Sequence, residues 1–229
     1  MQYQNIRPAI FLSRPNRFIA KVELEGREET VHVKNTGRCR ELLVPGCTVY
    51  LEKSGNPARK TAYDLIAVEK GELLINMDAQ APNKVFGEWA AAGHFREGLT
   101  LLKPETTWGK SRFDFYWETG EEKGFVEVKG CTLEEEGLAM FPDAPTERGV
   151  KHLRELTAAQ REGCRCTVCV VLQMKGCHAF CPNERTHPEF GQALREAAEA
   201  GVEVLALDCR VTPDSLVIDA PVKVLLNMP

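Results

Sequence analysis

The 229-residue sequence lacks any apolar run that approaches the roughly 20 residues needed to cross a membrane. Its first residues, MQYQN, also lack the charged and then apolar segments of a secretory signal. We find no internal repeat, low-complexity tract or long linker, and 43% of the residues are hydrophobic, which is enough for a packed core. The sequence is therefore expected to form a globular cytoplasmic protein that has no membrane partner.

The sequence also lacks the excess of positive charge that is typical of a nucleic-acid coat, since its formal net charge is −4. Residues 1–40 nevertheless carry eight Lys and Arg against four Glu, a net of +4, so the remaining residues sum to −8. A positive patch on an acidic body can still bind a polyanion locally.

The string NTGR at residues 35–38 is typical of a turn, and its backbone amides and nearby cations are candidates for contact with phosphate. The candidate cations are Arg14, Arg17, Lys34, Arg38 and Arg40. An ordinary hairpin turn with solvated arginines is an equally good interpretation. The neighbouring Phe18 is interpreted as a core residue in preference to a base-stacking platform.

Five of the nine cysteines crowd together, with two histidines nearby, and in a cytoplasmic protein most should be free thiols. The group is Cys164, Cys166, Cys169, Cys177, Cys181, His178 and His187. A zinc site is one interpretation, but the spacing is irregular for one. Residues 167–172 read as a buried strand, where free cysteine is common, and we therefore favour core and surface thiols.

The first eighty residues are expected to be all-β, with short strands at 18–24, 31–33, 48–52 and 63–68 separated by Gly, Asn and Pro. So many short strands in so few residues indicate a small barrel of the OB type. We therefore predict two domains, an OB-like barrel over residues 1–80 and a second domain over residues 81–229.

Longer elements follow in the second domain. The pattern predicts a helix over 83–95, strands at 112–117 and 124–130, a loop over 134–142, and a helix to about 161 that begins at Asp143 or Thr146. A strand (166–174), a helix (188–200) and a strand (202–207) complete it. The fold class is α/β (α+β): a mixed sheet flanked by helices that follows the barrel.

Two carboxylates interrupt the apolar strands of the predicted hairpin, Asp114 in RFDFYW and Glu127 in GFVEVKG. Glu127 and Lys129 share a face because strand side chains alternate. If register brings Asp114 to that face, Asp114 and Glu127 can hold Mg²⁺ or Mn²⁺, while Lys129 orients a water or stabilises the transition state. The alternative is a solvated Glu-x-Lys pair. Glu88 is a candidate fourth carboxylate, and Arg148, Lys151 and His152 form a helix face that is expected to touch the phosphate backbone.

These features in this order resemble the PD-(D/E)xK nuclease superfamily. The strings VHVKNTGRC (31–39), SRFDF (111–115), FVEVK (125–129) and AMFPDAPTERGVKHL (139–153) resemble the sugar fermentation stimulation protein A family over essentially the whole chain. The resemblance implies an OB-like domain, a restriction-endonuclease-like domain, non-specific DNA binding and a regulatory role in sugar (maltose) use. It places the nuclease motif on Asp114, Glu127 and Lys129, with Glu88 less certain, and Phe113 stands where the motif name has proline.

Three functions are compatible with this sequence. The first is a non-specific DNA-binding protein that keeps a nuclease-like metal site, and the second is an active Mg²⁺- or Mn²⁺-dependent nuclease of DNA or RNA. The third is a regulatory factor with a degenerate core, which the intact Asp114, Glu127 and Lys129 disfavour. Nucleic acid, above all DNA, is the expected partner.

Overall fold

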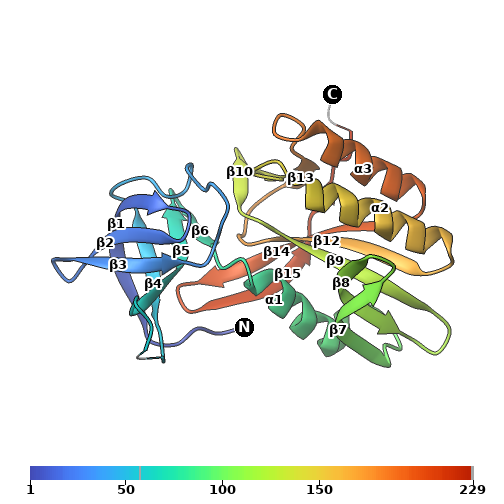
Figure 1. Ribbon diagram of the computed structural model, residues 1–229, viewed down its shortest axis with the longest axis horizontal. Helices are drawn as coiled ribbons and strands as arrows, with labels where there is room; N and C mark the ends of the chain where they lie inside the picture. Colours follow the sequence, from blue (N-terminus) through green and yellow to red (C-terminus); the bar gives the residue numbers. More distant parts are fainter. Residues whose placement is uncertain (57, 228–229) are drawn as a thin grey trace.

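The computed structural model describes residues 1–56 and 58–227, and its first part is a β-barrel (Figure 1). The hydrogen-bonded strand order is β3-β2-β1-β4-β5-β6, and a parallel pairing of β3 with β5 closes five of these strands into a barrel. The strands are β1 (Ile6–Asn16), β2 (Ile19–Leu24), β3 (Arg27–Val33), β4 (Thr48–Lys53), β5 (Tyr63–Lys70) and β6 (Leu73–Asn76).

The barrel core follows from the alternation of side chains along each strand. Ala20 and Val22 of β2 are fully buried, as are Val49 and Leu51 of β4. The four predicted strands are confirmed as β2 to β5, whereas β1 and β6 were not predicted. Only Ala9 and Phe11 of β1 are buried, so its eleven residues carry too little apolar alternation to reveal a strand.

The second part contains a six-stranded mixed sheet of order β15-β14-β12-β9-β8-β7. Strands β9, β12 and β14 run parallel, and β8, β7 and β15 are antiparallel to their neighbours. The strands are β7 (Leu101–Trp108), β8 (Ser111–Glu118), β9 (Lys123–Cys131), β12 (Arg165–Leu172), β14 (Glu203–Thr212) and β15 (Ser215–Pro221). The predicted α+β class, a barrel and then a mixed sheet with helices, is confirmed.

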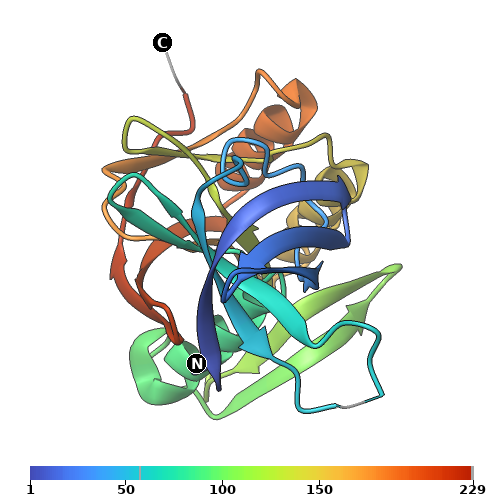
Figure 2. The ribbon, with the colours of Figure 1, turned by 90° about the vertical axis from the view of Figure 1, so that its left-hand side faces the viewer.

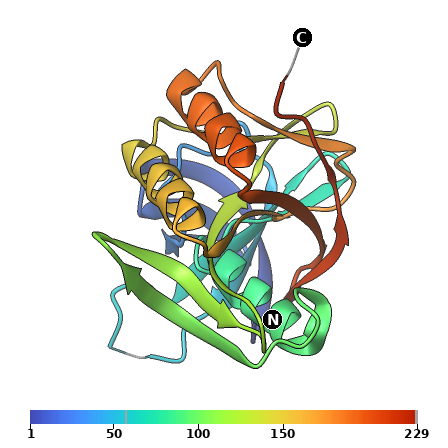
Figure 3. The ribbon, with the colours of Figure 1, turned by 90° about the vertical axis from the view of Figure 1, so that its right-hand side faces the viewer.

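Three helices cover the two faces of this sheet (Figures 1 and 3). Helix α1 (Ala81–Trp89), which continues as the π-helix Ala90–His94, covers one face, and α2 (Glu147–Arg161) and α3 (Pro188–Glu199) lie side by side on the other. Val168 and Val170 of β12 pack on the side of α2 and α3, while Cys169 and Val171 pack on the side of α1. None of the helices in the described residues is long and apolar enough to span a membrane.

The same alternation bears on whether the clustered cysteines form a zinc site or are core thiols. Cys166 belongs to the core under α2 and α3, and Cys169 belongs to the opposite core under α1, so one metal ion cannot bind both. All nine cysteines are free, and seven of them are buried. Burial raises the pKa of the thiols, to about 12 for Cys166. This is the behaviour of core thiols.

The predicted loop over residues 134–142 is wrong. Residues in this range form β10 (Leu133–Glu135) and β11 (Leu138–Phe141), which join β13 (Ala179–Pro182) and β16 (Lys223–Val224) in a small sheet of order β10-β11-β13-β16. A run of three glutamates and Gly137 obscures these strands in the sequence. Ala139 and Met140 are buried by the parallel pairing with β13, a contact that arises only in the folded chain.

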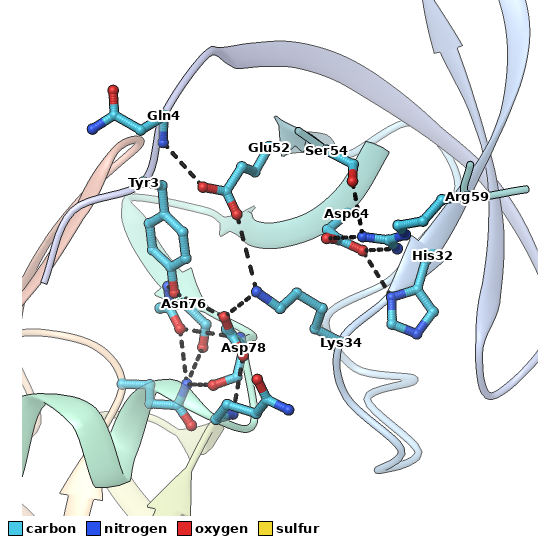
Figure 4. Close-up of polar contacts among 12 residues, drawn as sticks. Tyr3, Gln4, His32, Lys34, Glu52, Ser54, Arg59, Asp64, Asn76 and Asp78 are labelled. Atoms are coloured by element: carbon cyan, nitrogen blue, oxygen red, sulfur yellow. Dashed lines mark hydrogen bonds and ion pairs between the residues drawn. The ribbon is translucent and has the colours of Figure 1, made fainter. Parts of the chain in front are cut away.

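Figure 2 shows the barrel in front of the second domain, and a buried polar cluster fastens the two together (Figure 4). Asp78, which is 1% exposed, accepts from Lys34 Nζ at 2.7 Å and from the Tyr3 hydroxyl at 3.4 Å. Asn76 donates to the Tyr3 hydroxyl at 2.9 Å. From the second domain, Gln173 Nε2 donates to the backbone oxygens of Asn76 and Asp78 at 3.1 and 3.0 Å. We call this group the interface cluster (Tyr3, Lys34, Asn76, Asp78 and Gln173).

Candidate metal and nucleic-acid site

The site forms where strands β8 and β9 separate. Their backbone pairing runs from Glu118 and Lys123 to Phe115 and Val126, and it stops there. Beyond Val126, β9 continues to pair with β12 on its other side. The amide of Val128 therefore has no strand partner on the β8 side, and it donates to Asp114 Oδ2 at 2.7 Å. The fork brings Asp114 beside β9.

Asp114 is half-buried, and its second oxygen accepts from Asn83 Nδ2 of α1 at 2.7 Å. Burial, and then the negative charge of Glu127, raise the pKa of the Asp114 carboxyl above its ordinary value. The two carboxylates thus lie close enough to repel each other. A cation between them would relieve that repulsion.

Glu127 is 2% exposed, and a single carboxylate oxygen, Oε1, makes both of its side-chain contacts. Oε1 accepts from Lys129 Nζ and faces His152 Nδ1, each at 2.5 Å. Burial acts to raise the pKa of Glu127, but His152 and Lys129 outweigh it and lower that pKa. Oε2 is buried and has no hydrogen-bond partner among the described residues. A buried, ionised oxygen without a partner is costly unless a cation binds there.

His152 holds Glu127 from the helix side. Arg148 Nε donates to His152 Nε2 at 3.4 Å, so the ring proton of a neutral His152 is on Nδ1 and points at Glu127 Oε1. The sequence prediction placed His152 on an exposed face that touches phosphate. In the structure it is 7% exposed and contacts the candidate metal ligand instead, because α2 packs over β9 with this residue facing inward.

The structure places Glu88 away from this contact network. Its Oε2 accepts from the amino group of Met1 at 2.6 Å, and its side chain is 49% exposed. Glu88 lies five residues, about 140° around the helix, from Asn83, the α1 residue that reaches Asp114. The sequence prediction named Glu88 and missed Asn83, because no pattern in the sequence distinguishes Asn83 from a solvated residue.

A basic cleft of about 770 Å³ lies over His152, between α2 and the tip of the β7–β8 hairpin. Predicted Arg148 and Lys151 line it, and Lys151 also lies 3.9 Å from Glu155. Three further cations line the cleft and were not predicted: Lys110, Arg112 and Arg154. Lys110 and Arg112 belong to the hairpin tip, which lies beside α2 only in the folded chain. Among the described residues, neither Lys110 nor Arg148 forms an ion pair with a carboxylate. We call this the helix cleft.

A second basic cleft, of about 490 Å³, lies on the barrel and reaches the segment that leads into α2. Arg17, Arg38 and Arg40 line it, are exposed and form no ion pair within the part of the chain that the structure describes. Phe18 beside Arg17 is 51% exposed, so its interpretation as a core residue is wrong: it lies in the turn between β1 and β2. We call this the barrel cleft.

The other two predicted cations of the barrel have internal roles. The Arg14 guanidinium donates to four backbone oxygens at 2.6 to 2.9 Å, those of Arg17, Asn35, Gly37 and Arg38, and so shapes the loop that carries Arg38. Lys34 belongs to the interface cluster through Asp78. Acceptors within the protein thus occupy Lys34 Nζ and the two terminal nitrogens of Arg14, although Arg14 also lines the barrel cleft. Contact of these two residues with phosphate stays a prediction.

One other group has metal-like spacing, Glu147, His187 and Glu189 at the starts of α2 and α3. His187 Nδ1 accepts from the Thr146 amide at 3.3 Å, so the ring proton of the neutral histidine is on Nε2 and faces Glu147 at 3.5 Å. Glu189 pairs with Arg154 at 2.6 Å. The neutral ring therefore has no free lone pair for a cation.

Comparison with known proteins agrees with this architecture. Residues 12–77 match the family described as SfsA N-terminal OB domain, and residues 80–215 match the sugar fermentation stimulation protein RE domain. A sugar fermentation stimulation protein homolog of Desulfitobacterium hafniense (strain Y51) is 62% identical over 94% of both chains. That of Ruminiclostridium cellulolyticum is 54% identical over 99% of this chain and all of that one.

A solved structure has the same fold throughout. Pyrococcus furiosus SfsA, determined in complex with Ca²⁺, is similar with a TM-score of 0.89 and 30% identity over 98% of each chain. Both domains are thus shared with known members in order and extent. The chain belongs to the sugar fermentation stimulation protein family, with an N-terminal OB domain and a restriction-endonuclease-like domain.

Proposed function

We propose that this protein binds DNA with little sequence preference and holds a divalent cation at Asp114 and Glu127. The observation that carries the proposal is the buried Oε2 of Glu127, which has no partner among the described residues and lies beside a second carboxylate under a basic cleft. A carboxylate that uses both oxygens leaves no position for a cation. Here Lys129 and His152 share one oxygen and leave the other for a ligand.

The donor set fits a hard cation such as Mg²⁺ or Mn²⁺, because both ligands are carboxylates and no thiol or free imidazole joins them. The Ca²⁺ in the Pyrococcus furiosus relative supports the same class of ion. When bound, such an ion neutralises phosphate charge and lowers the pKa of a bound water. Asn83 and Val128 would keep Asp114 in place, and Lys129 and His152 would keep Glu127 in place.

The two basic clefts support a nucleic acid as the ligand. The barrel cleft ends at Ala144 and Pro145, and the helix cleft begins at Glu147 and Arg148, so the start of α2 adjoins both. Exposed arginines without carboxylate partners suit phosphate, and exposed Phe18 suits a base. No described helix projects as a separate base-reading element, which favours binding without sequence preference. A regulatory role in sugar (maltose) use would act through this binding.

Hydrolysis of nucleic acid is the second candidate, and a specific observation favours it. Lys129 Nζ lies 2.5 Å from Glu127 Oε1, so an ammonium is held beside the candidate cation. Phosphodiester cleavage benefits from such a positive charge near the reacting phosphate.

Two measurements test these functions. Binding of duplex DNA should weaken steeply as salt rises, and an affinity independent of salt would contradict the proposal. For cleavage, DNA and RNA are incubated with Mn²⁺ and either the wild-type protein or Glu127→Gln. Cleavage by the wild type alone that EDTA abolishes would support the nuclease, and equal cleavage by both proteins would indicate a contaminant.

A further inference from the structure

A pocket of about 300 Å³ lies between the two domains and is not used by the function proposed above. Its walls are the barrel loop 35–37, the carboxyl ends of β9 and β12, and the segment 140–146 that enters α2. The carboxyl ends of parallel strands, next to a following helix, are a common ligand position in sheets of this kind. The pocket shares four residues with the barrel cleft, so the two hollows are continuous: Thr36, Gly37, Ala144 and Pro145.

Gln173 presents a fixed acceptor to this pocket. The residue is 1% exposed, and its Nε2 donates to three acceptors, the backbone and side-chain oxygens of Asn76 and the backbone oxygen of Asp78. Because all three partners accept, the orientation of the amide is determined, and Oε1 lies against Gly130, 2.6 Å from where a Cβ would stand. No donor of the described residues reaches Oε1. A ligand with an N–H or O–H group would satisfy it.

The rest of the lining indicates the kind of ligand. Asp143 accepts from the Arg38 amide at 3.2 Å and forms no ion pair among the described residues, so it adds a second acceptor. Phe141 and Met140 supply apolar surface. Acceptors beside an apolar wall suit a flat, neutral group that carries N–H donors and do not suit a phosphate. An unpaired nucleobase exposes such donors on its Watson–Crick edge.

The pocket cannot widen to admit a duplex. A Cβ on Gly37 would lie 2.5 Å from Asp143 Oδ2, which shows how closely the barrel loop approaches the second domain. The interface cluster fastens the same two domains through Gln173. In a duplex the Watson–Crick edge is also already occupied by the partner base.

We propose that this pocket receives an unpaired base of the strand whose phosphates lie along the barrel cleft. The protein then prefers unpaired over paired DNA. The proposal rests on the nucleic-acid binding proposed above and adds the class of substrate.

The test uses an oligonucleotide with a central 2-aminopurine, either single-stranded or in a perfect duplex, in Ca²⁺ at fixed salt. The variants are Ala144→Phe, which fills the junction of the pocket with the barrel cleft, and Ala144→Ser, which leaves it open. The wild type should bind the single strand about tenfold more tightly or better, since one held base contributes about 1–3 kcal/mol. The fluorescence of the base should change on binding.

Ala144→Phe should lose this preference and keep its heat of Ca²⁺ binding, whereas Ala144→Ser should match the wild type. Ala79 lines this pocket but not the barrel cleft, so Ala79→Phe should lose the preference and also keep the affinity for duplex, and it repeats the test should Ala144→Phe fail to fold. Equal wild-type affinity for both DNA forms would contradict the binding of a base in this pocket. A preference for the single strand that persists in both Ala144→Phe and Ala79→Phe would contradict it too. A wild type that binds neither form would instead overturn the proposed function.

Discussion

Two buried groups of charged residues invite comparison, the interface cluster and the site around Asp114 and Glu127. Each has a carboxylate that is at most 2% exposed, Asp78 in one and Glu127 in the other, and each has a lysine within 2.7 Å. The two carboxylates differ in how many of their oxygens have partners. Asp78 uses both oxygens, since Gln80 donates to Oδ1 and Lys34 and Tyr3 donate to Oδ2. Glu127 leaves Oε2 without a partner among the described residues.

The difference separates a structural role from a binding role. A buried carboxylate that uses both oxygens gains nothing from a cation and helps to specify how two surfaces meet. An incomplete one retains a destabilising feature that a ligand can remove, which is typical of functional sites. Removing charges from the two clusters should therefore change different properties, stability in the first case and cation affinity in the second.

The largest effect is expected for Asp78→Ala. It leaves Lys34 half-buried without its partner at the joint between the domains, and breaking such a pair costs about 3–5 kcal/mol of unfolding free energy. Chemical denaturation measures this. Glu52→Ala is the matched control, because Glu52 lies 4.0 Å from the same Lys34 and should contribute less than about 1 kcal/mol. Equal losses in the two variants would remove the distinction between the clusters.

At the site, Asp114→Asn and Glu127→Gln should both abolish the calorimetric heat of Mn²⁺ binding while shifting stability in opposite directions. The raised pKa of Asp114 means that its charged form is unfavourable in the fold at neutral pH, so the neutral Asn should stabilise the protein. The lowered pKa of Glu127 has the opposite sign, and Gln should destabilise it. Unchanged Mn²⁺ heat in either variant would exclude that residue as a ligand.

A smaller loss is expected when His152 is replaced. Asn can place an N–H near the position of Nδ1 and so keep the contact with Glu127, whereas Gln reaches the position of Nε2 and Phe keeps only the volume. Mn²⁺ affinity should fall about 10- to 100-fold in His152→Phe and His152→Gln, and much less in His152→Asn. If His152→Asn lowers Mn²⁺ affinity as much as His152→Phe, an N–H at the Nδ1 position does not maintain the site, which would contradict the role assigned to this hydrogen bond.

The sequence predicted the elements and the neighbouring carboxylates whose cause is local. Strands β2 to β5, the helices, and the pair Asp114 and Glu127 follow from alternation, helical spacing and polar residues inside apolar runs. Sequence did not predict what tertiary packing decides: that Asn83 and not Glu88 reaches Asp114, that His152 faces inward, or that Arg14 and Lys34 are used internally. The local sequence does not distinguish an arginine that supports a loop, such as Arg14, from one whose guanidinium has no partner among the described residues, such as Arg38.

The smallest effect should separate those two kinds of arginine. Arg38 is exposed and its guanidinium has no partner among the described residues, so Arg38→Gln should leave the melting temperature unchanged. It should reduce the slope of log affinity against log salt for duplex DNA by about 0.9, the value for one lost phosphate contact. Arg14→Gln, by contrast, should lower the melting temperature, because four backbone oxygens lose their donor. An unchanged salt slope in Arg38→Gln would mean that DNA does not follow the barrel cleft, and only the helix cleft would then remain as its path.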